Sequence, residues 1–142
     1  MEYRVETVKI GRIKLERPNW VRKEDVMKVE EVARRLEEAM KGYDSPWFKF
    51  KEIEVNYCKP IVCEEDKVFI TVTLIPKDAT EDEDNYDDIR IGFIYNLTRG
   101  IKEFYHVTSL ADLTTLEQAL HVIYLTGKLV AEFYGSGGVV EA

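Results

Sequence analysis

Residues 68–95 read VFITVTLIPKDATEDEDNYDDIRIGFIY, and this stretch decides the fold. Two strongly apolar runs, Val68–Ile75 and Ile89–Tyr95, stand on either side of the acidic segment Asp78–Asp88 (DATEDEDNYDD). In the first run every second residue is apolar, and β-branched threonines stand between them, which favours a strand. The stretch therefore predicts two strands that are joined by a long, charged connection.

The acidic segment carries the whole net charge of the chain, which is −7 at pH 7. It holds seven carboxylates and no lysine or arginine, so that the remaining 20 acidic residues balance the 20 basic ones. Connections longer than about 12 residues that have no structure of their own are uncommon and are often functional. This segment is therefore the one place where the sequence departs from that of a plain small domain.

Three interpretations of the acidic segment remain open. Its carboxylates can converge on Ca²⁺ or Mg²⁺, which take clustered oxygen ligands, and the candidate metal ligands are Asp82, Asp84 and Asp88. The segment lacks the glycine and the final glutamate of a calcium-binding loop. Residues 78–88 can instead bind a basic protein partner, or form only a solvated connection that self-repulsion keeps open.

The chain before these strands begins with a strand pattern and continues with a helix pattern. Residues 3–16 alternate between apolar and polar with two slips of phase, which fits one bent strand or a short hairpin with an irregularity at Gly11. Residues 18–41 are predicted to form an amphipathic helix that opens at Pro18-Asn19 and ends at Gly42. Strands follow this helix, and Ile101–Thr108 is expected to pair with Ile89–Tyr95 as a hairpin.

The last predicted element is a long helix from about Leu113 to Tyr134, with Thr114 and Glu117 at capping-box spacing and Asp112 as an alternative N-cap. Its apolar arc is wider than the roughly 100° that one buried face needs. Such a helix is either wedged between layers or shared with a second subunit. We therefore expect a homodimer, with interface residues such as Tyr124 and Leu125.

The order β-α-β-β-β-β-α predicts a two-layer α+β fold, in which an antiparallel sheet of about five strands carries two helices on one face. The expected organisation is a single domain over residues 1–134, followed by a flexible tail over residues 135–142.

Composition and targeting signals predict a cytoplasmic protein. Residues 1–10 lack the layout of a signal peptide, and no apolar stretch is long enough to span a membrane. Cys58 and Cys63 are therefore expected to be reduced, and without a second Cys or His pair they are not expected to bind zinc. Glutamate and lysine supply thirty residues and glutamine only one, which is typical of proteins from hot environments.

Two histidines are the candidates for acid–base chemistry or ligand binding: His106 on a predicted strand, and His121 on the polar stripe of the last helix. Each can equally have a structural or surface role. The sequence contains no nucleophile elbow and no phosphate-binding loop. Aromatic and basic residues alternate over Trp47–Lys51, but the net charge disfavours nucleic-acid binding, and the entry of aromatics into a core is the simpler interpretation.

These patterns favour a non-enzymatic interaction or regulatory domain that self-associates through its C-terminal helix. The alternative is a small-molecule or divalent-metal-binding protein, enzymes included, with a site between the sheet and that helix near His106 or His121. A third hypothesis is an acidic module that binds a basic partner through residues 78–88. Neither nucleic acid nor membrane is an expected partner.

Overall fold

The computed structural model describes residues 2–80, 87–108, 113 and 115–135. The described chain forms six strands and two helices, which confirms the predicted α+β class, with six strands instead of about five. The elements, in chain order, are β1 (Val5–Ile10), β2 (Ile13–Pro18), α1 (Lys23–Met40), β3 (Phe48–Tyr57), β4 (Lys67–Pro76), β5 (Ile89–Asn96), β6 (Ile101–Val107) and α2 (Leu116–Gly135).

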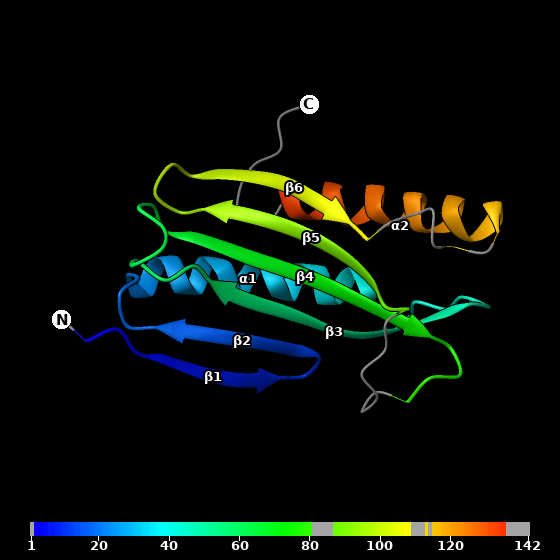
Figure 1. Ribbon diagram of the computed structural model, residues 1–142, viewed down its shortest axis with the longest axis horizontal. Coiled ribbons are helices and arrows are strands. Elements are labelled where there is room, and N and C mark those ends of the chain that lie inside the picture. The colour runs from blue at the N-terminus through cyan, green and yellow to red at the C-terminus, as the bar shows by residue number, and fades with distance from the viewer. Residues whose placement is uncertain (1, 81–86, 109–112, 114, 136–142) are drawn as a thin grey trace.

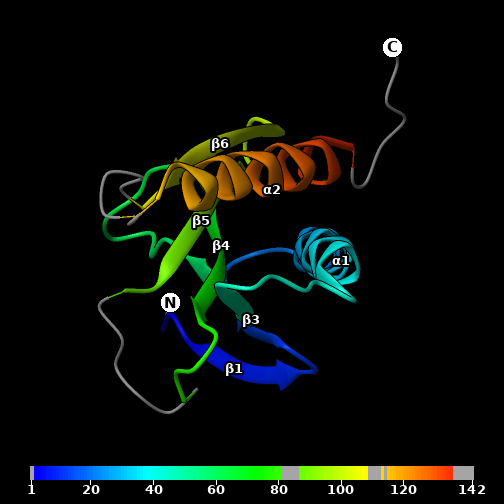
Figure 2. The ribbon, with the colours of Figure 1, turned by 90° about the vertical axis from the view of Figure 1, so that its right-hand side faces the viewer.

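The six strands form one sheet in which every strand lies beside its neighbours in the sequence, in the order β1-β2-β3-β4-β5-β6. All pairs are antiparallel except β2 and β3, which run parallel and are connected through α1. Both helices lie behind the sheet in the view of Figure 1, so the prediction of two helices on one face is confirmed. Figure 2 shows α2 beside β6 and α1 nearer the middle of the sheet.

The first residues form a hairpin, one of the two arrangements that the slipped alternation allowed. Its turn is at Gly11, whose φ of 59° is costly for a residue with a side chain. A carboxylate oxygen of Glu37 on α1 accepts a hydrogen bond of 2.7 Å from the Arg12 amide, directly after the turn. The turn is therefore anchored to the helix layer.

Helix α1 begins at Lys23, so the predicted start at Pro18 is wrong. Pro18 ends β2, and Asn19 is held in the loop because its amide and side chain both bond with the backbone of Arg4, at 2.9 Å each. The predicted end is correct to within two residues, since α1 ends at Met40 and Gly42 takes a φ of 77°.

The core lies between the sheet and the two helices. In β4, alternate apolar residues such as Ile70 and Val72 point toward the helices, as the sequence predicted. Each helix supplies one apolar stripe with the spacing of a buried helix face. These stripes are Val26, Val29, Val32, Ala33, Leu36 and Met40 of α1, and Val122, Leu125, Leu129 and Phe133 of α2.

Helix α2 begins at Leu116, three residues after the predicted start near Leu113. Thr115 Oγ1 accepts a hydrogen bond of 3.1 Å from the Gln118 amide, and the Gln118 side chain accepts one of 3.3 Å from the Thr115 amide. This reciprocal pair is a capping box, shifted by one residue from the predicted Thr114–Glu117 pair. The other predicted cap, Asp112, and Thr114 itself lie outside the described residues.

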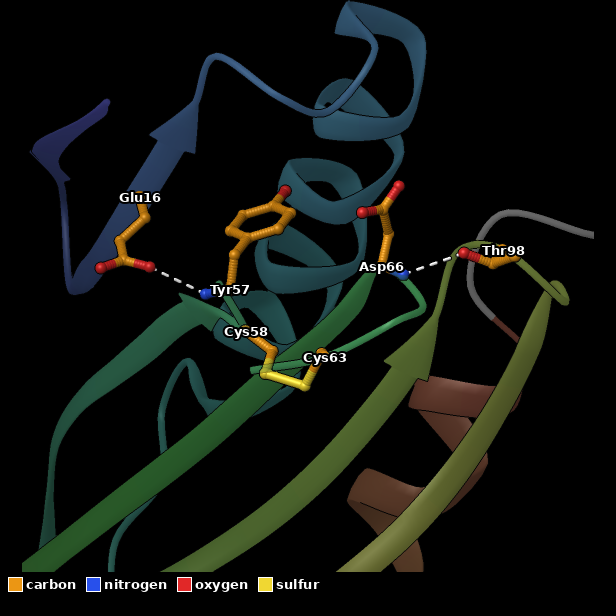
Figure 3. The surroundings of a disulfide bond; sticks show 6 residues. All are labelled: Glu16, Tyr57, Cys58, Cys63, Asp66 and Thr98. Atoms are coloured by element: carbon orange, nitrogen blue, oxygen red, sulfur yellow. Dashed lines mark hydrogen bonds between the residues drawn. A yellow bond between two sulfur atoms is a disulfide. The ribbon is translucent and has the colours of Figure 1, made fainter. Parts of the chain in front are cut away.

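Cys58 and Cys63 form a disulfide, so the prediction that they are reduced is wrong (Figure 3). Cys58 follows the last residue of β3, and a turn in which the amides of Val62 and Cys63 bond to the Lys59 carbonyl brings the chain back on itself. The two Cα atoms are 6.0 Å apart, within the range that a disulfide spans. The expectation failed because it rested on the predicted compartment and not on this local geometry.

Neither of the two described helices has an apolar window long enough to cross a bilayer.

Candidate functional site

The side of α2 that faces away from the core carries large apolar residues in contact with solvent. Leu116 and Tyr124 are the most exposed of these side chains, at 75% each, and Gly127 lies in the same stripe with open space where a Cβ would be. We call this stripe the outer face of α2. Its members are Leu116, Leu120, Ile123, Tyr124, Gly127, Ala131 and Tyr134.

The outer face lies opposite the core stripe of the same helix. At 3.6 residues per turn, neighbouring residues differ by about 100° in direction, which is why Tyr124 is exposed while Leu125 is only 4% exposed. Leu125 belongs to the core of its own chain, so its assignment to a subunit interface is wrong. The wide apolar arc that the sequence shows is therefore two arcs, one buried and one exposed.

Two polar residues of α2, His121 and Glu132, face α1 and the segment that follows it. Arg35 of α1 approaches Glu132 to 3.6 Å. His121 Nε2 lies 2.6 Å from the hydroxyl of Tyr43, in a hydrogen bond. The rings of Trp47 and Phe48 lie 5.8 and 6.4 Å from the imidazole. The predicted strand start over Trp47–Lys51 thus sends aromatic side chains into the fold and forms a contact with α2.

Burial lowers the pKa of His121 below its ordinary value and raises the pKa of Tyr43. At neutral pH the imidazole is therefore uncharged and the phenol protonated, a pairing that suits one short hydrogen bond between them. The hydrogen bond between His121 and Tyr43 joins α2 to the segment after α1. We interpret it as a structural contact whose strength depends on pH.

The lowered pKa of His121 makes a testable prediction for stability. A histidine with a depressed folded-state pKa binds protons better when unfolded, so its contribution is complete above pH 6.5 and is lost as the pH falls through the folded pKa. Between pH 7.5 and 5.5, the free energy of unfolding in urea is expected to fall more in the wild type than in His121→Gln. His106→Gln is the matched control, and a flattened profile there instead of in His121→Gln would contradict the prediction.

His106 lies on the opposite face of the sheet from the helices. It pairs across the sheet with Gly92, which alternates with the core residues Ile91 and Phe93. Its ring covers Gly92 closely, since a Cβ on that glycine would be 3.0 Å from Nδ1. The sheet therefore separates the two histidines, and only His121 lies on the α2 side, where the alternative site was predicted.

A pair of carboxyl groups that sequence reasoning missed lies on the same face as His106. Glu52 and Glu54 of β3 share a hydrogen bond between their side chains, which raises the pKa of Glu52 and lowers that of Glu54. Lys14 and Arg90 lower the pKa of Glu54 further. When the pair carries a single proton, Glu52 therefore holds it and donates it to Glu54. The signal was available, because residues two apart in a strand share a face.

The acidic segment is only partly described. Asp82 and Asp84 lie outside the described residues, while Asp88 is 8% exposed and its Oδ2 lies 3.9 Å from Arg90 Nη2. Over the described ranges, no three His, Cys, Asp or Glu side chains come together in a way that would hold a metal ion. The metal site at Asp82, Asp84 and Asp88 and the basic partner for residues 78–88 both stay predictions.

At least three grooves of the described surface have the size of a ligand site, with volumes of about 300, 370 and 540 Å³, and the largest of these three contains Tyr43, the partner of His121. It lies at the C-terminal end of α1 and has a volume of about 540 Å³. Its lining includes Tyr43, Phe50 and five charged residues, which are Arg12, Glu37, Glu38, Lys41 and Lys49. Ligand pockets usually have 300–1,000 Å³ and a mainly apolar lining. The groove has a volume in this range, but its lining is more charged than that of a usual ligand pocket.

Comparison with known proteins gives no assignment: no family model, curated protein or solved structure matches the chain.

Proposed function

We propose that the protein is a non-enzymatic interaction domain that self-associates through the outer face of α2. The observation that carries the proposal is the contiguous exposed apolar stripe on a helix whose other side is already buried. Single exposed apolar residues are normal on any protein, whereas a contiguous patch marks an interaction surface. A second copy is the partner, because symmetric homodimers are the commonest oligomers and the same patch then serves both subunits.

Light scattering in solution tests this proposal. The wild type is expected to have twice the monomer mass of 16.6 kDa at micromolar concentration, and Leu120→Glu is expected to give a folded monomer, because the carboxylate would have to enter an apolar interface. Met27→Glu is the matched control, since Met27 is an exposed apolar residue on α1. A wild type that stays monomeric at high concentration contradicts the proposal.

We further propose that this domain works in the cytoplasm of an organism that lives at high temperature. The composition supports the hot source, and the disulfide between Cys58 and Cys63 is compatible with the cytoplasm there, because intracellular proteins of hyperthermophiles are rich in disulfides. Alkylation of thiols at lysis, followed by mass spectrometry of the cytoplasmic fraction, tests the location and the disulfide separately. Absence of the protein from that fraction would contradict the location, and alkylated cysteines in it would contradict an intact disulfide there.

The groove at the end of α1 supports a second candidate function, the binding of an anionic small molecule. Three basic side chains, Arg12, Lys41 and Lys49, line it beside two aromatic rings and outnumber the two carboxylates in the lining, Glu37 and Glu38. Calorimetric titration with inorganic phosphate, with Lys49→Ala as the comparison, tests this candidate, and equal heats for both proteins would count against it.

A further inference from the structure

We infer that two α2 helices pair in antiparallel orientation about a two-fold axis that crosses the outer face between Ile123 and Tyr124. The pairing rests on the proposed self-association and adds the orientation and the contacts of the interface. The apolar residues of the outer face stand at equal distances on the two sides of this point, and large residues on one side match small residues on the other. The charged residues beside the outer face match in the same way, acidic with basic.

The apolar residues match in size across the proposed axis. In an antiparallel pair, the fourth residue on one side of the axis faces the fourth residue on the other, so Leu120 faces Gly127 of the second copy. By the same rule the eighth residues, Leu116 and Ala131, face each other. Ile123 and Tyr124 lie on opposite flanks of the outer face, so each of them meets the same residue of the second copy. Each leucine thus meets a small residue, and Gly127 offers open space because, apart from the local helix backbone, no atom of the described chain lies within 4 Å of the place of its absent Cβ.

The charges beside the outer face match in sign. Glu117 and Lys128 are both exposed and stand eleven residues apart, about three helical turns, so they lie along the same flank of the outer face. A two-fold axis that makes the helices antiparallel places this flank against the same flank of the second copy. Glu117 is the seventh residue before the axis and Lys128 the fifth after it, a difference of two residues, or about 3 Å along the helix. Two reciprocal Glu117–Lys128 pairs follow.

A parallel arrangement does not produce these pairs. About an axis parallel to the helices, the flank with Glu117 and Lys128 would face the other flank of the second copy. That flank carries Ala119 and Val130, which have no charge to offer. The antiparallel and parallel dimers therefore respond differently to charge reversal. Binding of a different protein to this face would also respond differently from the antiparallel dimer.

Charge reversal and mixing test the antiparallel pairing. Glu117→Lys places four lysines along the paired flanks of a dimer, and Lys128→Glu places four glutamates there, so each variant alone is expected to dimerise at least about tenfold more weakly at low salt because like charges meet. In an equimolar mixture, each lysine of the first variant faces a glutamate of the second, and the dimer is expected to return with wild-type affinity. Sedimentation velocity measures all three samples.

The outcomes separate the pairing from the proposed function. If the wild type is monomeric, the self-association itself is wrong. If the wild type is dimeric but both variants dimerise equally well, or if mixing does not restore the dimer, self-association stands and the antiparallel pairing is overturned. Glu6→Lys and Lys9→Glu on β1 are the matched controls, because they change the net charge equally at the far edge of the sheet. Circular dichroism verifies that every variant is folded.

Discussion

Replacing Leu125 with glutamate is expected to unfold the protein, whereas the same change at Tyr124 is expected to leave a folded monomer. Leu125 is buried among the core side chains of its own chain, while Tyr124 projects into solvent. An uncompensated carboxylate in an apolar core costs several kcal/mol, which is comparable with the roughly 5–15 kcal/mol that stabilises a whole domain. Circular dichroism and urea unfolding distinguish the two variants.

A volume-conserving change at the same position is the control for this prediction. Leu125→Met keeps an apolar side chain of similar size, so it is expected to cost less than about 1.5 kcal/mol. A Leu125→Glu protein that unfolds at the urea concentration of the wild type would place Leu125 outside the core, and the described orientation of α2 would then be wrong.

The second large effect is expected where α2 meets β5. Phe133 is fully buried, and its ring centroid lies 4.7 Å from that of Phe93. The ammonium group of Lys102 lies 5.7 Å from the same ring. Phe133→Ala removes these contacts and leaves a cavity, so the free energy of unfolding is expected to fall by about 3–5 kcal/mol.

Urea unfolding at a concentration where the protein is monomeric measures this loss without a contribution from assembly. Phe133→Leu fills most of the same space and is expected to lose much less. A loss below about 1 kcal/mol for Phe133→Ala would show that the end of α2 does not depend on this contact.

Much of the fold could be predicted because its strands alternate cleanly. The pairing of β4 with β5 follows from the two apolar runs around the acidic segment. The alternation of residues along β4 shows directly which of its side chains face the core. The parallel pairing of β2 with β3 could not be predicted. Parallel strands are joined by a long crossover connection, here the one that contains α1, so no tight turn in the sequence marks them as neighbours. The start of α1 was misplaced because Pro18-Asn19 resembles a helix start, while the contact of Asn19 with Arg4 holds that segment against β1.

The candidate site was predictable only in part. Periodicity gives the angle between residues of a helix but not the position of the sheet, so it showed a wide arc on α2 without separating Tyr124 from Leu125. The pairing of His121 with Tyr43 joins residues 78 positions apart, and no sequence spacing indicates it. The disulfide was missed for a different reason, since its local spacing was outweighed by the predicted compartment.

The parallel junction of β2 and β3 has a consequence for the order in which the sheet forms. Strands β3 to β6 follow one another through consecutive antiparallel pairs, whereas Ile13 meets Ile53 only after a loop of about forty residues has closed. Loop closure costs more entropy as the loop lengthens, and contacts between distant residues slow folding. We therefore expect the β1–β2 hairpin to join last and to detach first. The amide of Ile53, bonded to the Arg12 carbonyl at 2.9 Å, is the hydrogen whose exchange would report that opening.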